Sequence, residues 1–316
     1  MLPRTSCTQP CDKKKARPLL ATKIIEFFGY SATDLSANAR DARARQWCPF
    51  IDSPCQKRLS DQSVSGACTL KPTKSGPVIC CPVRLYADNY RILESVAKHA
   101  FDCEPQLIEG SRVLAESPLP GKERVAVFGK RWGGELRLPN RTRGGGYFVD
   151  WVLARIDLDG QLKDFVAVEV QSIDTTGNYQ EERRAHLAEQ HFAGSSTAGF
   201  NWENVNKRIL PQIIYKGHAL RREPACKGGL FFVCPHPVYN KIRERLGGNL
   251  MEYQLQPGSL SLMWYDIGPE VPPGHIRELE LKGSFTTTVD QVALAFTAPT
   301  NLPDSRAYEN AIRSAL

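Results

Sequence analysis

The sequence contains no run of about 18 consecutive apolar residues, which is the length that a membrane-spanning helix requires. The N-terminal stretch MLPRTSCTQPCDKKKARP is polar and basic, and it lacks the apolar segment of a secretory signal. No segment repeats at a fixed period, and no low-complexity tract is long enough to interpret. These absences argue against a membrane protein, a secreted protein and a repeat architecture, and they predict a cytoplasmic protein.

The chain of 316 residues is long enough to bury a substantial core, as one large domain or two modest ones. Its net charge of +7 permits a polyanionic partner but does not require one. The sequence has ten cysteines, and structural disulfides are rare in a reducing cytosol. The cysteines therefore indicate a metal site or buried thiols.

Composition divides the chain into three parts. Residues 1–20 are expected to form a loose basic arm, whose lysines would attract phosphates without sequence preference. Residues 21–84 include a turn-rich stretch with five cysteines, and residues 85–316 carry the longer apolar patterns. Periodicity predicts a helix over 86–101, a β-rich block over 111–173, a helical region over 180–222, a strand in GGLFFVCP, and helices in VYNKIRERLG and near TVDQVALAF. This order indicates an α+β, mixed-sheet fold.

A β-hairpin is predicted in FVDWVLARIDLDGQLKDFVAVEVQSI, where two apolar runs flank Asp159 and Gly160. Asp-Gly between such runs favours a two-residue turn in which both residues have positive φ. Paired residue numbers then sum to 319, which places Asp150 opposite Glu169. Two facing carboxylates about 5 Å apart repel each other, so a cation or a shared proton is expected between them.

Strand alternation adds a third polar side chain to this pair. Phe165, Ala167, Glu169 and Gln171 share one face of the strand, and Val166, Val168 and Val170 share the other. Asp150, Glu169 and Gln171 therefore converge, and their oxygen ligands suit Mg²⁺. The alternative is an ordinary polar hairpin face, because a bulge or a longer turn would break the predicted pairing.

Four cysteines in the turn-rich stretch are candidate metal ligands: Cys48, Cys55, Cys68 and Cys81. Their spacing lacks the C-x2-C knuckle of common zinc ribbons. Four thiolates in a loop-rich segment nevertheless favour a tetrahedral sulfur site for Zn or Fe. The stretch has few large apolar residues, so a bound metal would help it to fold.

The choice of cysteine ligands leaves alternatives. Cys80 is the alternative to Cys81, which we prefer because Pro follows it, as Pro follows Cys48. Cys7 and Cys11 are a rival pair in the basic arm. The remaining cysteines are interpreted as buried thiols: Cys103, Cys226 and Cys234.

Acidic residues and short segments occur along the chain in a recognisable order. The acidic set comprises Glu135 in GGEL, Asp150 in YFVDW, and Glu169 with Gln171 in VEVQSIDTTGNY. The segments WCPF, CCPVRLY and NWENVNKRILPQI accompany it. Together they resemble the NotI-type restriction endonucleases, a branch of the P-D…(D/E)-x-K nuclease superfamily. The resemblance covers most of the chain and is clearest between Trp47 and Phe232.

This resemblance implies a restriction-endonuclease-like mixed β-sheet flanked by helices in a catalytic domain of residues 85–316. It implies that residues 21–84 form a DNA-contacting module whose four cysteines hold iron. It also implies an Mg²⁺-dependent phosphodiesterase in which Asp150 and Glu169 bind the catalytic metal. Glu135 would complete the acidic cluster or help to hold a second ion.

Two positions depart from the superfamily pattern. Val149 replaces the proline of Pro-Asp, and Gln171 replaces the lysine, a substitution that this branch shares. A glutamine can neither act as a base near pH 7 nor supply a positive charge. Its amide can orient the attacking water through hydrogen bonds.

Arginines and glycines crowd the segment GKRWGGELRLPNRTRGGGYFVD, just before Asp150. Glycines allow close approach to a phosphate, and arginines bind phosphates or read guanine edges. We therefore expect DNA contacts from Arg131, Arg137, Arg141 and Arg143. The alternative for each arginine is a solvated surface position.

The leading hypothesis is a type II restriction endonuclease from a prokaryotic host that acts as a homodimer on double-stranded DNA. Palindromic cutting follows from two-fold symmetry, and the resemblance alone implies a GC-rich site. One alternative is a non-catalytic DNA-binding protein with a four-cysteine metal site. Another is a DNA-repair nuclease with an iron–sulfur cluster, which visible absorption and sulfide content would distinguish.

Overall fold

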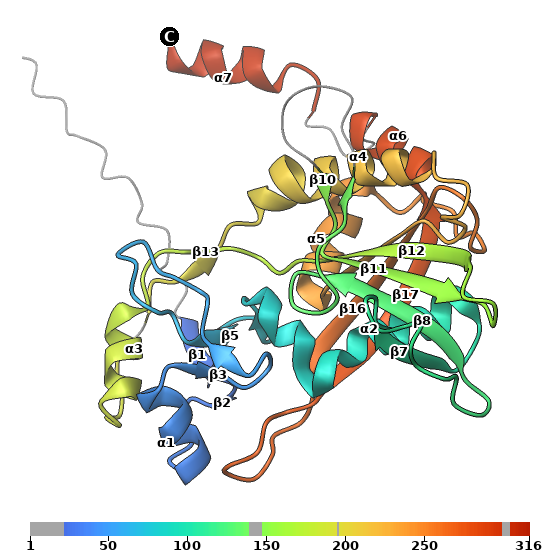
Figure 1. The fold of residues 1–316 in the computed structure, drawn as a ribbon. Coiled ribbons are helices and arrows are strands. Elements are labelled where there is room, and N and C mark those ends of the chain that lie inside the picture. Colours follow the sequence, from blue (N-terminus) through green and yellow to red (C-terminus); the bar gives the residue numbers. More distant parts are fainter. Residues whose placement is uncertain (1–21, 139–146, 195, 299–303) are drawn as a thin grey trace, which may run out of the picture.

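The computed structural model describes residues 22–138, 147–194, 196–298 and 304–316. Its largest unit is a seven-stranded mixed sheet in the order β17-β16-β15-β12-β11-β8-β7, shown in Figure 1. The strands of this sheet are β7 (Pro105–Glu109), β8 (Glu123–Gly129), β11 (Trp151–Ile156), β12 (Leu162–Val170), β15 (Leu230–Pro235), β16 (Ser259–Ile267) and β17 (Leu279–Thr288). The predicted mixed α/β fold is confirmed.

Seven α-helices occur in the described part of the chain. They are α1 (Ala37–Ala44), α2 (Ala87–Phe101), α3 (Gln180–Leu187), α4 (Leu210–Leu220), α5 (His236–Leu246), α6 (Val289–Thr297) and α7 (Ala307–Ala315). The predicted helices over 86–101 and in the two C-terminal segments are confirmed as α2, α5 and α6. None of the helices in the described ranges is long and apolar enough to cross a membrane.

The central strands β12, β15 and β16 run parallel, and β11 and β17 flank them antiparallel. All six residues of β15 are buried. A strand that is buried on both faces reads as a continuous apolar run, which is why LFFVCP shows no alternation. The carboxyl ends of the three parallel strands lie at one edge of the sheet.

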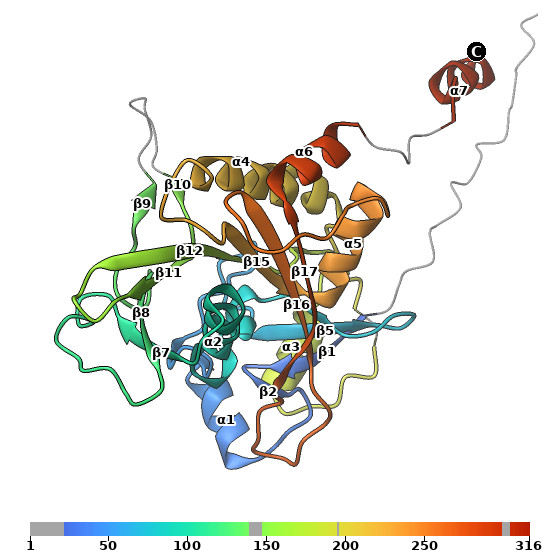
Figure 2. The same ribbon diagram turned by 90° about the vertical axis from the view of Figure 1, so that its right-hand side faces the viewer.

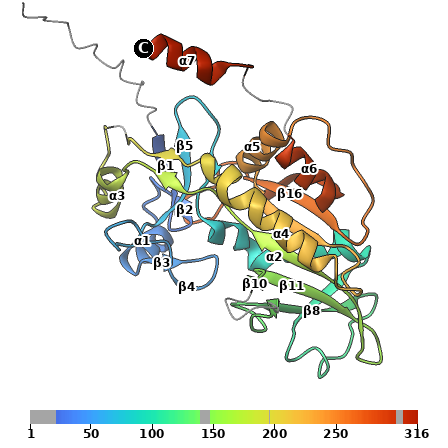
Figure 3. The ribbon, with the colours of Figure 1, turned by 90° about the horizontal axis from the view of Figure 1, so that it is seen from above.

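Helices cover both faces of this sheet. Val166, Val168 and Val170 of β12 pack with α2 in one apolar core. Ala167 packs on the other face in a core that includes α4, α5 and α6, and Figure 2 and Figure 3 show these three helices together on one side of the sheet. The predicted alternation along β12 is therefore confirmed.

The register of the predicted hairpin is also confirmed. Trp151 pairs with Val168, and Arg155 pairs with Asp164, so that the paired numbers sum to 319. The predicted pairing therefore holds from Arg155 to Trp151, the first residue of β11.

The predicted two-residue turn is wrong. The loop has three residues, 158–160, with Gly160 N–H donating to the carbonyl of Asp157 at 3.2 Å and Asp157 N–H donating to that of Gln161 at 3.0 Å. Of the loop residues, Gly160 alone has a positive φ, at 81°. A one-residue bulge at Lys163 compensates for the extra loop residue, and this is why the register is right although the turn is not.

The N-terminal part of the described chain forms a second, small sheet in the order β2-β1-β5-β6, beside α1 and α3 in Figure 1. Its strands are β1 (Thr22–Phe27), β2 (Tyr30–Ser31), β5 (Ala67–Pro72) and β6 (Val78–Ile79). Two-residue strand pairs complete the strands: β3 (Trp47–Cys48) with β4 (Ser53–Pro54), β9 (Arg137–Leu138) with β10 (Tyr147–Phe148), and β13 (Thr175–Thr176) with β14 (Gly199–Phe200).

This small sheet has an apolar core of its own, contrary to the expectation that the cysteine-rich stretch has too few apolar residues. Phe27 and Phe28 come from outside the stretch and are fully buried, and they pack with Leu70 and with the cysteines. The pairing of β1 with β5 brings these aromatic residues in, and sequence windows taken separately do not reveal it. Burial therefore contributes to the folding of this part.

A buried ion pair joins the small sheet to the larger one. Glu26 of β1 accepts hydrogen bonds from Arg84 Nε and Nη2 at 3.0 Å, and both side chains are almost completely buried. Arg84 Nη2 also donates to the carbonyl of Arg277 at 2.7 Å. Arg84 lies in the 3-10 helix η1 (Pro82–Tyr86), directly before α2, so this contact fixes the small sheet against α2.

Candidate active site

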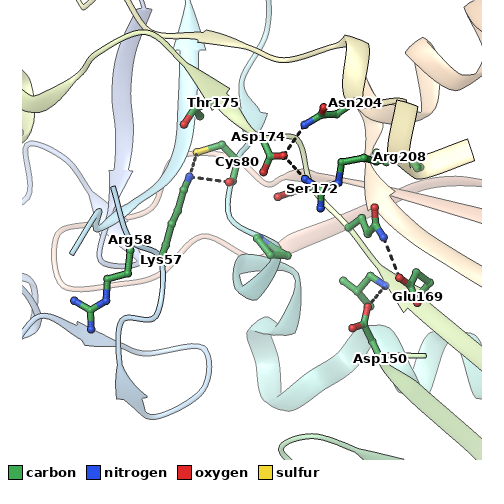
Figure 4. Close-up of a pocket in the computed structure, with 14 residues that line it drawn as sticks. Lys57, Arg58, Cys80, Asp150, Glu169, Ser172, Asp174, Thr175, Asn204 and Arg208 are labelled. Carbon is green, nitrogen blue, oxygen red and sulfur yellow. Dashed lines mark hydrogen bonds and ion pairs between the residues drawn. The ribbon is translucent and has the colours of Figure 1, made fainter. Parts of the chain in front are cut away.

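A cavity of about 550 Å³ lies where the small sheet meets the carboxyl end of β12, as Figure 4 shows. A second cavity adjoins it and shares the lining residues Lys57 and Asp150. The polar side chains around the first cavity are Lys57, Arg58, Asp150, Glu169, Gln171, Ser172, Asp174, Thr175, Asn204 and Arg208. The two cavities together form one cleft.

Asp150 lies one residue before β11, and its side chain continues the hairpin ladder. Its Oδ2 accepts a hydrogen bond from the backbone N–H of Val170 at 2.8 Å. The carboxylate therefore takes the place of a backbone acceptor at the point where β11 begins. This bond holds Asp150 beside Glu169, as the register predicts.

Glu169 is held from two sides. Its Oε1 accepts from Gln171 Nε2 at 2.9 Å, and its Oε2 accepts from Lys216 Nζ at 2.6 Å. Only 5% of the Glu169 side chain and 12% of the Lys216 side chain are exposed. Gln171 Nε2 also donates to Gln212 Oε1 at 3.2 Å. Both Gln212 and Lys216 come from α4, which covers this face of the sheet.

Burial and nearby negative charge act together on Asp150. Burial and, after it, the charge of Glu169 raise the pKa of its carboxyl to about 7, although Lys216 opposes the change. A carboxyl with this pKa is poised between its charged and neutral forms near pH 7. The two carboxylates therefore repel each other, and a cation between them would relieve the repulsion.

Glu135 and Arg131 line the second cavity together with Asp150. Glu135 is exposed, and its negative charge contributes to the raised pKa of Asp150. Arg131 Nη2 donates a hydrogen bond to Gln56 Oε1. The structure thus brings these two predicted residues to the cleft but leaves Glu135 at its open side.

Three more arginines were predicted to contact DNA: Arg137, Arg141 and Arg143. Arg137 lies in β9, and Arg141 and Arg143 lie outside the described residues. The same holds for residues 1–20, and thus for Cys7 and Cys11.

Two polar groups that the sequence reasoning missed also line the cavity. Asp174 Oδ2 accepts from Asn204 Nδ2 at 2.6 Å and from Arg208 Nη1 at 2.9 Å. Across the cavity, Lys57 Nζ donates to the carbonyl of Cys80 at 2.7 Å. Figure 4 shows the two groups on different sides of the cavity, with Lys57 next to Cys80. The cleft thus presents cations as well as carboxylates.

The four candidate cysteine ligands are buried: Cys48, Cys55, Cys68 and Cys81. Burial raises the pKa of Cys48 to about 12 and that of Cys81 to about 11, and it raises the pKa of Cys68 well above its usual value. Other cysteines of the set contribute to each of these raised pKa values, so the thiols lie within electrostatic range of one another.

Cys80 is held differently from this set. Its Sγ lies 3.2 Å from Lys57 Nζ and 3.5 Å from the carbonyl oxygen of Cys68. Its thiol is therefore engaged by an ammonium group and a backbone acceptor. These contacts distinguish Cys80 from the four candidate ligands.

In the part of the chain that the structure describes, no three Cys, His, Asp or Glu side chains are close enough to form a ready-made metal site. Mg²⁺ is commonly bound through one or two carboxylates, with water and substrate phosphate as the other ligands. Asp150 and Glu169 fit that donor set. The four cysteines fit a thiophilic metal by their chemistry and burial, because a bound cation would favour the thiolates that burial disfavours.

Comparison with known sequences identifies the family. The family model described as Restriction endonuclease NotI matches residues 32–226, which is more than half of the chain. This chain belongs to the NotI restriction endonuclease family. No curated protein matches the chain.

Members of the NotI family are restriction endonucleases, enzymes that hydrolyse DNA. The match includes the described cysteine set, the hairpin with Asp150 and Glu169, and α4 with Lys216. It ends before β15, so β15, β16 and β17 lie outside it. The resemblance noted in the sequence to the NotI-type enzymes is confirmed.

Lys216 and Gln212 are further site residues that the sequence did not indicate. They lie four residues apart, so they share one face of α4. That spacing is visible in the sequence, but which strand the face covers is not. The contact with Glu169 depends on how α4 packs on the sheet.

Proposed function

We propose that this protein is a type II restriction endonuclease that cuts both strands of DNA in an Mg²⁺-dependent reaction. The observation that carries the proposal is the pair of carboxylates, Asp150 and Glu169, which line one cleft within the region that matches the NotI family. A protein that only bound DNA would gain nothing from two adjacent acids in its cleft that repel the phosphate. The fold is proposed to be that of the P-D…(D/E)-x-K nucleases.

Asp150 and Glu169 would hold the Mg²⁺ ion, and Glu135 would complete the acidic cluster from the second cavity. When bound, Mg²⁺ supplies positive charge that neutralises the attacked phosphate and activates water for attack. Gln171 would orient that water. Both hydrogen bonds that the described structure gives the Gln171 amide use Nε2, so its Oε1 can accept a hydrogen bond from the attacking water.

The four cysteines are proposed to hold one structural Fe or Zn ion in a module of residues 21–84. The module would help to bind DNA, because Lys57 and Arg58 reach the same cavity as Asp150. Residues 85–316 would form the catalytic domain. Arg131 would bind a phosphate from the second cavity, and basic residues of the 1–20 arm would add affinity without sequence preference.

We propose that the enzyme is a homodimer that cuts a palindromic, GC-rich site in a prokaryotic cytoplasm. A two-fold axis would present one cleft to each strand. The C-terminal helix α7 supports an association between copies, because all nine of its residues are exposed. Tyr308 and Ile312, four residues apart, are 86% and 58% exposed. In the proposed dimer, a second copy of the chain would cover this apolar pair.

The direct test is to digest phage DNA with the protein in Mg²⁺ and to compare it with Glu169→Ala. We expect discrete fragments from the wild type and none from Glu169→Ala. We also expect the variant to keep its affinity for DNA in Ca²⁺, which bridges carboxylates and phosphate without supporting cleavage. A variant that cut normally would show that Glu169 is not part of the catalytic machinery.

A further inference from the structure

Lys216 brings a positive charge into contact with the acidic pair from a different element of the fold. Its Nζ lies 2.6 Å from Glu169 Oε2, and its side chain is 12% exposed. Ile213 and Leu220 of the same helix are buried in the core that also contains Ala167 of β12. The packing of α4 on this face of the sheet therefore fixes where the Lys216 stem begins.

The contact has a chemical consequence because of the residue at position 171. Gln171 is neutral, and its Nε2 donates a hydrogen bond to Oε1 of Glu169. Lys216 Nζ donates to the other carboxylate oxygen, Oε2. The carboxylates of Asp150 and Glu169, together with an incoming phosphate, concentrate negative charge in the cleft. Across the cavity, the ammonium of Lys57 is held by Cys80. Lys216 is thus the cation that touches the acidic pair in the described structure.

We propose that Lys216 supplies the positive charge that Gln171 cannot supply, as a positioning residue that acts through Glu169. This inference rests on the proposed function and extends it to a residue outside the strand motif. The lysine offsets the repulsion between Glu169 and Asp150, and it balances the charge that builds up on the phosphate during cleavage. Charge at this point can be delivered from α4 or from position 171, since both side chains reach the same carboxylate.

The interchangeability of the two positions gives the test. The variants are Lys216→Met, Lys216→Arg and the double exchange Lys216→Gln with Gln171→Lys, and Lys163→Met is the matched control. Lys163 is 48% exposed, at the other end of β12. We expect Lys216→Met to lower kcat on the order of 100-fold while KM changes by less than about threefold. Lys216→Arg and the double exchange are expected to recover at least about tenfold of that loss.

A second readout does not depend on cleavage. Without Lys216, the acidic pair carries an uncompensated charge, so Ca²⁺ should stabilise the DNA-free Lys216→Met protein at lower concentration than it stabilises the wild type. Thermal unfolding at a series of Ca²⁺ concentrations measures this shift. The double exchange should return the midpoint to the wild-type value, and Lys163→Met should leave it unchanged. A lysine with only a packing role would not move this midpoint.

Three results would overturn the inference: wild-type kcat in Lys216→Met, a folded double exchange no faster than Lys216→Met, or an unchanged Ca²⁺ midpoint. If Lys216→Met does not fold, the test is the cleavage rate of the folded double exchange. The inference then requires that this variant cuts DNA within about tenfold of the wild-type rate. Failure of the proposed function looks different. In that case the wild type itself would not cut DNA, while the Ca²⁺ midpoint would still test the charge on Glu169.

Discussion

Replacing Asp150 with asparagine should stabilise the metal-free protein at alkaline pH, although it should abolish cleavage. Burial and the charge of Glu169 raise the pKa of Asp150 from 3.8 to about 7. A carboxyl whose pKa is higher in the folded state binds protons more tightly when folded. Its contribution is therefore favourable below about pH 4, and it is lost as the pH rises through about 7.

The size of the effect follows from the pKa difference. One pKa unit corresponds to about 1.4 kcal/mol, so the rise of about three units is equivalent to roughly 4 kcal/mol above pH 8. Asparagine keeps an acceptor for the Val170 N–H and removes the charge. The amide does not reproduce every contact of the carboxyl group. We therefore expect Asp150→Asn to gain about 2–4 kcal/mol at pH 8.5, and about 2–3 kcal/mol less than that at pH 5.

The assay is urea unfolding in EDTA at both pH values, with Asp164→Asn as the matched control. Asp164 lies in the same hairpin and is paired with Arg155 at 2.6 Å, so its replacement should destabilise the protein at pH 8.5. Mg²⁺ or Ca²⁺ should stabilise the wild type at pH 8.5 and Asp150→Asn much less. If Asp150→Asn were less stable than the wild type at pH 8.5, the two carboxylates would not be in conflict and the reasoning would be wrong.

Three further predictions concern the surroundings of the cleft. Arg84→Met should lower the free energy of unfolding by about 3–5 kcal/mol, because it leaves the buried Glu26 without a balancing positive charge; a loss below about 1 kcal/mol in urea unfolding would contradict this. Cys81→Ser should reduce the Fe or Zn content of the purified protein, as measured by mass spectrometry, and Cys80→Ser should not; the reverse pattern would exchange the two assignments. Arg131→Gln should weaken DNA binding in Ca²⁺ and reduce the slope of log affinity against log salt by about 1, and an unchanged slope would remove Arg131 from the phosphate contacts.

The parts of the fold that the sequence predicted are those with strong local patterns. The alternation in β12 and the continuous apolar run of β15 each follow from burial on one or both faces of a strand. The small sheet was missed because β1 pairs with β5, about 45 residues further along the chain. Such a pairing depends on long-range contacts, which leave no local period in the sequence.

The candidate site was predictable where it depends on the hairpin. The register that places Asp150 opposite Glu169 was derived from a two-residue turn at Asp159 and Gly160. It is right although that turn is wrong, because the bulge at Lys163 restores the pairing. Lys216 was not predictable in the same way. Its role depends on the face of α4 that packs over β12, and neither the spacing of residues in α4 nor the motif around Gln171 specifies that packing.

The proposed function requires that the acidic pair, Asp150 and Glu169, drives site-specific cleavage of DNA. The most direct measurement is to sequence the ends of DNA that the purified protein has cut in Mg²⁺, with Glu169→Ala in parallel. We expect the wild-type ends all to lie at one short symmetric sequence, and we expect Glu169→Ala to produce no ends. Ends scattered over the DNA, or the same ends from Glu169→Ala, would contradict it.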